Sequence, residues 1–373
     1  MPVEPGVPLF DVKPRPDILR REIERAVLGV LDRGAYILGP EVHGFEAEFA
    51  RALDFKHVVA VSSGTSALEI ALQALGLGAG DEVVLPTFTF IATATAVSVT
   101  GAKPVLADVD DETLVMGAKE MSDALTRRTK AVIPVHLFGH PAPMKEILAL
   151  SRKRRLKVVE DCAQSHLTIS DGKRAGSWGD LGAFSFYPSK GLGAAGDAGA
   201  ISTGSPVLAR VCRELRNCGR GEGKGYFHVR VGGNARMDEI QAAILRVKLK
   251  RMAAWIDARR AVAERYGQEL AGLPLRLPPS GDAKNRPSYA LYVVRCEERD
   301  ALAEHLRGQG VSCGVYYPVP LHLQPAYKSL GYRAGDFPNS ERASKTALAL
   351  PMFPDMSPGQ IERVCRAVRS FFR

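Results

Sequence analysis

The feature that most constrains the fold is an alternation of short β-rich runs with helical patterns between residues 57 and 203. Strands that alternate with helices along the chain are typical of a mostly parallel sheet wrapped by helices. We therefore predict an α/β fold of this kind. The predicted strands lie at residues 57–61, 82–85, 104–107, 131–135, 158–161, 183–187 and 200–202.

The segments on either side of this region predict the rest of the architecture. Two amphipathic helices, at residues 16–31 and 43–52, flank a break at Gly39 and Pro40, and residues 237–270 have the composition of long helices. A Pro/Gly-rich stretch at 272–287 follows. Beyond it, a small α/β unit is predicted from residues 288–296, 300–306, 311–317 and 359–372. We expect an N-terminal segment and large domain over 1–250 and a small C-terminal domain over 251–373.

Composition excludes several classes of protein. With 373 residues, 46% hydrophobic and 24% charged, the chain has a globular composition and room for a large core. It has no run of 18 apolar residues, and the N-terminus lacks the basic and apolar segments of a secretory signal, so we expect a cytoplasmic protein with no membrane contact. The six cysteines have neither zinc-ligand spacing nor the density of a disulfide scaffold, so we expect no metal.

The net charge of +9 has two interpretations. Its densest cluster, residues 152–155, lies at the end of a predicted helix, which favours a solvated helix end over a nucleic-acid site. We therefore expect no nucleic-acid partner. A basic surface would still attract an anionic small substrate.

Lys190 is the first candidate for chemistry. It follows the predicted strand and turn of residues 184–189. A lysine that leaves a buried strand can be partly desolvated, which lowers its pKa and makes it a nucleophile for Schiff-base formation. The alternative is a surface lysine, since most lysines after strands are exposed.

Asp161 is the second candidate, at the end of an apolar strand that closes with Glu160 and Asp161. The carboxyl end of a parallel strand faces the crevice where α/β folds bind ligands, so this carboxylate could hold a proton on a pyridine nitrogen. The alternative is a helix N-cap, because aspartate is a favoured capping residue.

A third candidate is the turn Ser62-Ser63-Gly64-Thr65-Ser66, between a strand and an Ala/Leu-rich helix. Small residues at a helix N-terminus let backbone N–H groups and hydroxyls close on a phosphate. A capping turn needs only one serine or threonine, so the turn has more hydroxyls than capping requires.

A phosphate seat, an acid for a pyridine nitrogen and a Schiff-base lysine are the groups that pyridoxal phosphate (PLP) needs. The motifs resemble those of the DegT/DnrJ/EryC1/StrS family of PLP-dependent nucleotide-sugar aminotransferases, which have the fold-type I architecture of aspartate aminotransferase. The likeness covers nearly the whole chain. Its motifs are Tyr36-Ile37-Leu38-Gly39-Pro40, Ser63-Gly64-Thr65-Ser66-Ala67-Leu68, Glu160-Asp161 with Gln164, Phe184-Ser185-Phe186-Tyr187-Pro188 with Lys190, Gly196-Asp197, Asn234-Ala235-Arg236-Met237-Asp238-Glu239 and Pro320-Leu321-His322.

The resemblance implies roles for these residues. Lys190 would form the Schiff base and move the proton, and Asp161 would keep the pyridine nitrogen protonated. Gln164 would bond the ring hydroxyl. Phe90 would stack on the ring, although Phe88 and Phe90 also fit alternating core positions. The phosphate would be held by Gly64, Thr65, Ser66 and Ser185.

The resemblance also implies partners. Asn234, which alone would suggest a turn, matches a residue that reaches the phosphate from the other subunit of a homodimer with shared active sites. The substrates would be a nucleotide-linked ketosugar and an amino-acid donor, L-glutamate, in amino-sugar or surface-polysaccharide biosynthesis. Tyr317 and His322 are expected to contact the substrate.

Several alternatives stay open. Gly191-Leu192-Gly193-Ala194-Ala195-Gly196 satisfies the dinucleotide fingerprint of an NAD-dependent dehydrogenase, but residues 198–202 continue as a strand where that motif requires a helix. A non-catalytic regulatory protein on the same fold is a further alternative. Family members that dehydrate sugars carry histidine at the position of Lys190, so lysine argues against that activity.

The site of amination is predicted at C3 of the sugar. The run from Tyr36 to Pro40 resembles that of the C3 enzymes more than that of the 4-ketosugar aminotransferases. The run His228-Val229-Arg230-Val231-Gly232 is similar to enzymes whose sugar is a 3-keto-N-acetyl uronate, and Arg230 would pair with the sugar carboxylate. The alternative is a surface arginine in a basic protein.

Overall fold

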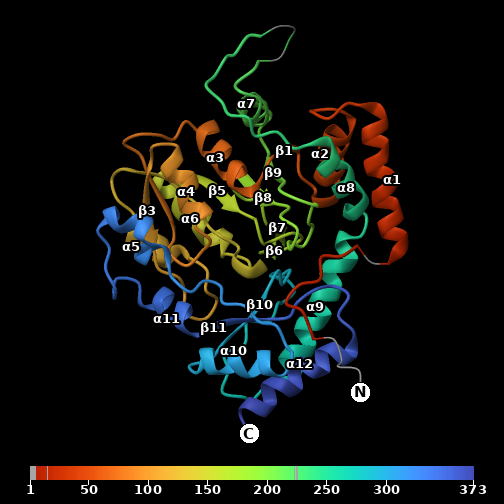
Figure 1. Cartoon of the computed structure of the whole chain (residues 1–373). Helices are drawn as coiled ribbons and strands as arrows, with labels where there is room; N and C mark the ends of the chain where they lie inside the picture. Colours follow the sequence, from red (N-terminus) through yellow and green to blue (C-terminus); the bar gives the residue numbers. More distant parts are fainter. Residues whose placement is uncertain (1–5, 15, 222, 224–225) are drawn as a thin grey trace.

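A seven-stranded sheet forms the centre of the molecule in this computed structural model, which describes residues 6–14, 16–221, 223 and 226–373 (Figure 1). The strand order is β1-β9-β8-β5-β4-β2-β3, and all pairs are parallel except those of β9, which is antiparallel to β1 and β8. The predicted sheet and all of its strands are confirmed. The strands are β1 (His57–Val61), β2 (Glu82–Pro86), β3 (Lys103–Ala107), β4 (Thr129–Val132), β5 (Lys157–Asp161), β8 (Leu181–Ser185) and β9 (Gly199–Thr203).

Helices cover the sheet, as expected when strands are apolar on both sides. Nearly every residue of the seven strands is buried. The helices that follow individual strands are α3 (Gly64–Ala74), α4 (Ala92–Val99), α5 (Ala118–Ala124), α6 (Met144–Arg154) and α7 (Pro206–Arg216), with the short η1 (Leu137–Gly139) before α6 and the hairpin β6 (Ile169–Ser170) and β7 (Lys173–Arg174) before β8. The predicted helix end at residues 152–155 is confirmed.

A second group of helices lies at one side of the sheet. The helices α1 (Asp17–Arg33), α2 (Pro40–Leu53), α8 (Glu239–Leu249) and α9 (Met252–Glu269) are drawn at the right of Figure 1. Glu239 joins distant segments here, because its carboxylate accepts hydrogen bonds from the N–H groups of Gly39, Glu41 and Val42 at 2.8–2.9 Å. Two motifs 200 positions apart therefore form one structural unit.

The C-terminal part forms a smaller α/β unit around β10 (Tyr292–Arg295) and β11 (Ala347–Leu350), which pair antiparallel. The predicted helices are present, but residues 311–317 make only isolated bridges, through Val311 and Gly314. The unit also contains α10 (Arg299–Gly308), η2 (Leu321–Leu323), η3 (Pro325–Leu330), α11 (Pro338–Thr346) and α12 (Pro358–Phe371).

The predicted division between residues 250 and 251 stays a prediction. It falls between α8 and α9, but α9 contributes Ile256 to the core under α2 and Tyr266 to the core of the small unit. Val7, from the N-terminal segment, pairs with Val311 and is buried in the same small core.

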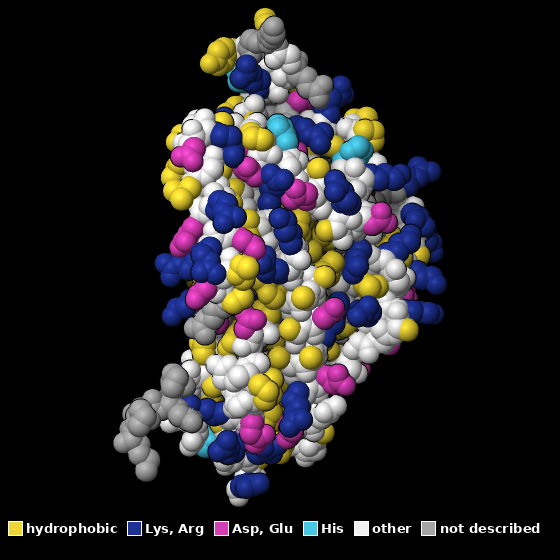
Figure 2. All heavy atoms as spheres, turned by 90° about the vertical axis from the view of Figure 1, so that its right-hand side faces the viewer, with side chains coloured by type: hydrophobic (Ala, Val, Ile, Leu, Met, Phe, Trp, Pro, Cys, Tyr) yellow, Lys and Arg dark blue, Asp and Glu magenta, His cyan; other side chains and the backbone are white. Residues whose placement is uncertain are grey.

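Two surface properties complete the description. Among the described residues, no helix is long and apolar enough to cross a membrane. Figure 2 shows Lys and Arg side chains scattered among acidic and apolar ones over the face that carries α1, α8 and α9. Residues 1–5, on which the expected lack of a secretory signal partly depends, lie outside the described part of the chain.

Candidate active site

A cavity of about 690 Å³ lies where the strands of the sheet end. Its lining includes residues that terminate or directly follow β1, β2, β5 and β8, together with Phe10 from the N-terminal segment. Ligands bind at this edge of an open parallel sheet because loops from several strands converge there. Of the predicted site residues, the lining includes Gly64, Thr65, Phe90, Asp161, Gln164, Ser185, Lys190 and Tyr317.

Lys190 lies in the irregular loop between β8 and β9, and its backbone N–H donates to the carbonyl of Tyr187 at 2.9 Å. Burial lowers the pKa of the Lys190 amine to about 8, although the negative charge of Asp161 acts in the opposite direction. Desolvation disfavours an ammonium ion, so a large share of this amine is neutral near pH 8. The structure therefore places a nucleophilic amine at the cavity rather than a surface lysine.

Asp161 is the last residue of β5 and is buried at the cavity. Its carboxylate accepts hydrogen bonds from the Thr93 hydroxyl at 2.8 Å and from the Ala163 N–H at 3.1 Å. Burial raises the pKa of Asp161, and these two hydrogen bonds and Lys190 counteract the rise. No helix follows Asp161, so a helix-capping role is excluded. In the part of the chain that the structure describes, no cation forms an ion pair with this carboxylate.

The N-terminus of α3 forms the predicted anion seat. Ser63 and Ser66 form a reciprocal capping box, in which the Ser66 hydroxyl accepts from the Ser63 N–H at 2.9 Å. The N–H groups of Gly64 and Thr65, both at the cavity, have no acceptor among the described residues. A Cβ at Gly64 would lie 2.6 Å from the Cβ of Ser185, so glycine is required for the helix to approach β8 this closely. Capping accounts for Ser63 and Ser66, and the open N–H groups are free for an anion.

The aromatic side chains divide between core and cavity. Phe88 is fully buried, whereas Phe90 is 56% exposed and lines the cavity, with its ring 6.2 Å from that of Tyr317. Gln164 accepts from the Phe138 N–H at 2.6 Å and donates to the Tyr317 hydroxyl at 3.1 Å. Phe90 is therefore available to stack on a ring, and Gln164 is fixed at the same wall.

Four predicted site residues are absent from the cavity lining of this chain: Ser66, Arg230, Asn234 and His322. His322 is buried between the Thr87 hydroxyl at 3.0 Å and the Glu341 carboxylate at 3.1 Å, so its ring holds the segment around η2 against the end of β2. Arg230 donates to Glu214 at 2.6 Å, and Asn234 is exposed. The described residues 217–221, 223 and 226–235 follow α7, and this arm projects from the body in Figure 1.

Some residues of the site are not in the sequence prediction. Thr93 supports Asp161, and its hydroxyl lies 3.3 Å from that of Thr89. Thr93 lies in the first turn of α4, but Thr89 precedes the helix, so helical spacing does not mark this pair in the sequence. Phe10 also lines the cavity, as does Asp197 of the Gly196-Asp197 motif, for which the sequence predicts no role. Nothing local in the sequence marks Phe10, because its position depends on contacts with distant segments.

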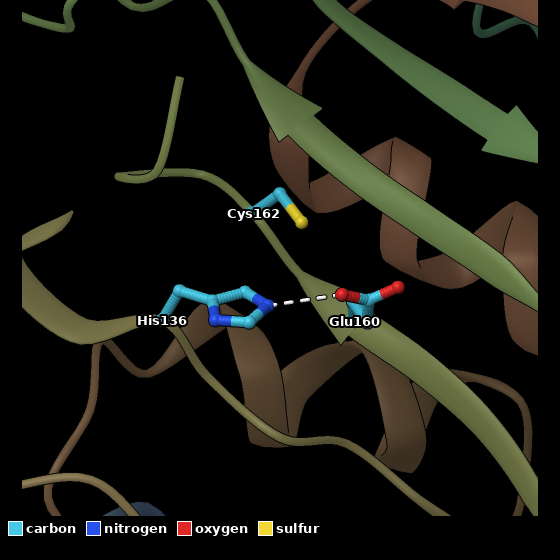
Figure 3. A group of neighbouring side chains, drawn as sticks. All are labelled: His136, Glu160 and Cys162. Atoms are coloured by element: carbon cyan, nitrogen blue, oxygen red, sulfur yellow. Dashed lines mark hydrogen bonds and ion pairs between the residues drawn. The ribbon is translucent and has the colours of Figure 1, made fainter. Parts of the chain in front are cut away.

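Three buried residues next to the site, His136, Glu160 and Cys162, lie close enough together to hold a metal ion (Figure 3). Hydrogen bonds within the protein already engage His136 and Glu160. His136 Nε2 lies 3.0 Å from the Glu160 carboxylate, and His136 Nδ1 accepts from the Ala142 N–H at 3.0 Å. The same carboxylate accepts from the N–H groups of Gly176, Trp178 and Gly179 at 2.7–2.8 Å. These bonds give Glu160 a structural role behind β5, beside the cavity residue Asp161.

The dinucleotide-like run of residues 191–196 is also explained. It lies in the irregular loop between β8 and β9, and no helix begins within it. The fingerprint requires a helix N-terminus at that point, so this feature gives no support to a dehydrogenase.

Comparison with known proteins decides the family. Residues 17–369 match the DegT/DnrJ/EryC1/StrS aminotransferase family. The chain belongs to this family. The confirmed predictions are the family, the fold-type I architecture and the enzyme class of PLP-dependent sugar aminotransferase.

Two relatives and two solved structures illustrate the likeness. The chain is 43% identical over 368 residues to the dTDP-3-amino-3,4,6-trideoxy-alpha-D-glucose transaminase of Streptomyces venezuelae, covering 98% of this chain and 96% of that protein. It is 42% identical to the UDP-N-acetyl-3-dehydro-alpha-D-glucosamine 3-aminotransferase of Acidithiobacillus ferrooxidans, covering 98% and 97%. DesV of S. venezuelae, solved with a ketimine intermediate, superposes with a TM-score of 0.95 at 43% identity and covers 99% of each chain. NtdA of Bacillus subtilis, solved with bound cofactor PMP, has a TM-score of 0.90 at 31% identity and covers 98% of this chain and 85% of that one.

The cofactor of the family fits the residues of the cavity. PLP carries a phosphate, a pyridine nitrogen and a carbonyl carbon that reacts with amines. The open N–H groups of Gly64 and Thr65 suit the phosphate. The buried carboxylate of Asp161, which has no ion pair among the described residues, suits a protonated ring nitrogen. The amine of Lys190 lies at the same cavity.

Proposed function

We propose that the protein transfers an amino group from an amino acid, L-glutamate, to C3 of a nucleotide-linked ketosugar. The observation that carries the proposal is the single cavity that unites Lys190, Asp161 and the N-terminus of α3. The choice of C3 is supported by two relatives above 40% identity whose names both specify position 3 of the sugar. We place the reaction in the cytoplasm, in amino-sugar or surface-polysaccharide biosynthesis.

The side chains of the cavity have separate tasks in this proposal. When bound, PLP supplies an electron sink for the carbon whose C–H bond breaks. Lys190 would take the proton from that carbon and deliver it to C4′ of the cofactor. Because the pKa of its amine is about 8, the amine can both accept and donate a proton near that pH. Asp161, held by Thr93 and Ala163, keeps a proton on the ring nitrogen. Phe90 and Tyr317 line one wall of the cavity, where the Phe90 ring would stack on the pyridine ring.

We further propose a homodimer with shared active sites. In the described part of the arm, Tyr226 is 87% exposed, Phe227 78% and Val231 98%. Large apolar side chains that are exposed together are typical of an interface. Asn234 lies on the same arm, at the isolated bridge between Asn217 and Asn234. In a dimer this arm would bring Asn234 to the phosphate seat of the partner subunit.

The uronate substrate is a second candidate, because Arg230 lies on this arm. Its guanidinium already pairs with Glu214, so binding a sugar carboxylate would require Glu214 to share or release it. Amination at C4 of a nucleotide-linked 4-ketosugar, by the same chemistry, is the alternative to amination at C3.

The test is a panel of nucleotide-linked ketosugars incubated with ¹⁵N-glutamate. It contains a 6-deoxy 3-ketosugar, an N-acetylated 3-ketohexose, a 3-keto uronate and a 6-deoxy 4-ketosugar. We expect ¹⁵N in a 3-amino product. Labelling of the 4-ketosugar alone would refute the choice of C3, and turnover of simple 2-oxo acids without any sugar would refute the sugar substrate.

A further inference from the structure

Two side chains of α8 hold the loop that carries Lys190, which we define as residues 186–198. Gln241 Oε1 accepts a hydrogen bond from the Ala195 N–H at 2.9 Å. The Lys248 amine donates to the carbonyl of Gly193. Gln241 and Lys248 are seven positions apart, so they lie on one face of the helix, two turns from each other. The helix therefore grips the loop at two points just beyond Lys190.

Lys248 is an unusual residue for this place. Among the described residues it has no ion pair, and its amine lies 6.0 Å from the centroid of the Trp255 ring. Burial lowers the pKa of Lys248 to about 8. Taking an ammonium ion out of water costs free energy, and the hydrogen bond to Gly193 is the interaction that offsets this cost.

The position of Gly193 determines the position of the turn that carries Lys190. The carbonyl of Pro188 packs directly against Gly193, where any side chain would collide with it. Two backbone hydrogen bonds close this part of the loop. The Lys190 N–H donates to the Tyr187 carbonyl, and the Ala194 N–H donates to the Phe186 carbonyl. Movement of the Gly193 carbonyl would therefore displace the turn from which the Lys190 side chain leaves.

The helix itself is anchored on another side. Glu239 accepts hydrogen bonds from the N-terminus of α2, and Arg246 pairs with Glu41 at 2.6 Å and with Glu48 at 2.5 Å. Because α8 is bonded to α2, it can serve as a fixed support for the loop.

We propose that Lys248 is a positioning residue for the transamination reaction: its bond to Gly193, supported by Gln241, holds the Lys190 loop in the conformation that presents the Lys190 amine to the cavity. The inference rests on Lys190 being the reacting amine, as proposed above. Lys248 itself contacts neither substrate nor cofactor in this role.

The test compares Lys248→Met, Lys248→Arg and the control Lys250→Met in the full-length protein as purified. Lys250 is exposed and is the C-cap residue of the same helix, and no side-chain hydrogen bond joins it to the loop among the described residues. Hydrogen exchange of the peptide covering residues 186–198 is measured together with kcat and the KM for glutamate. In Lys248→Met we expect about tenfold faster exchange of the Ala194 and Ala195 amides and a fall in kcat of about tenfold, with KM changed less than about twofold. Lys248→Arg, which keeps a charged donor, should restore both, and Lys250→Met should match wild type.

The proposal is overturned if Lys248→Met exchanges and turns over like wild type, or if its exchange rises equally in every peptide. Should Lys248→Met fail to fold, Gln241→Leu removes the bond at Ala195 and must show the same local change. Loop exchange does not depend on the substrate. A wild-type protein that transaminates no sugar would therefore refute the proposed function while the exchange comparison still decides the role of Lys248.

Discussion

Replacing Thr93 by valine tests how the protein controls Asp161. Valine has nearly the shape of threonine, and Thr93 is buried, so the substitution removes the 2.8 Å hydrogen bond to Asp161 with little change in packing. A hydrogen bond to a charged group contributes about 1.5–3 kcal/mol. The ionised carboxylate loses that stabilisation, and because 1.4 kcal/mol is a factor of ten, protonation becomes about ten- to a hundredfold more favourable.

The consequence is a loss of function that is largest at acid pH. Asp161 must be ionised to hold the protonated ring nitrogen, and burial already raises the pKa of this carboxyl group. At pH values where protonation of Asp161 limits binding, we expect the Kd for PLP to rise about ten- to a hundredfold in Thr93→Val and to approach wild type as the pH increases.

Fluorescence titration of the cofactor-free protein with PLP across pH measures this effect. Thr95→Val is the matched control, since the Thr95 hydroxyl donates to the Ile91 carbonyl on the same helix. Thr93→Ser should retain most of the affinity, and Asp161→Asn sets the upper limit of the loss. An equal loss in Thr93→Val and Thr95→Val, or a loss that does not depend on pH, would refute the reasoning.

Four further predictions follow from the same geometry. Lys190→Ala should fold and dimerise but show no turnover in the ¹⁵N-transfer assay, because it lacks both the amine and the proton carrier; residual turnover near wild type would contradict its role. Gly64→Ala should weaken PLP binding about tenfold in an absorbance titration, since its Cβ would lie 2.6 Å from Ser185, whereas Gly204→Ala, with open space around its Cβ, should bind normally. The rate at which PLP attaches to the cofactor-free protein should rise about tenfold per pH unit below 8 and level off above it, because burial lowers the pKa of Lys190 to about 8; a rate still rising at pH 10 would indicate an ordinary lysine. Arg230→Ala should lower kcat/KM about ten- to a hundredfold for a 3-keto uronate and hardly at all for a 6-deoxy 3-ketosugar, and equal effects on both substrates would exclude a bond to the carboxylate.

The sheet could be predicted from the sequence because each strand is a short apolar run between helical patterns. The direction of β9 could not, since antiparallel pairing with β1 and β8 depends on how the loop after Lys190 turns the chain back. The strand Ala347–Leu350 cannot be predicted for a different reason: alanine and leucine favour helices locally, and only pairing with β10 makes this run a strand.

The site was predictable where local chemistry is unusual. Lys190, Asp161 and the turn at Gly64 each combine a strand end with a reactive or anion-binding group, and all three line one cavity. Alternation alone could not separate Phe88 from Phe90, because β2 ends at Pro86 and neither residue lies in the sheet. Tertiary contacts decide the roles of two further residues, which the sequence alone could not. His322 is predicted at the substrate but bonds to Glu341, whereas Thr93 is not predicted but supports Asp161.

The central claim is that Lys190 is the amine that reacts with the cofactor, and borohydride reduction of the PLP-loaded protein followed by peptide mapping tests it most directly. Lys248 provides an internal competitor, because burial lowers the pKa of this second amine to about 8 as well. We predict a single phosphopyridoxyl label on the peptide that contains Lys190. A label on Lys248 or on any other lysine, with Lys190 unmodified, would contradict the account.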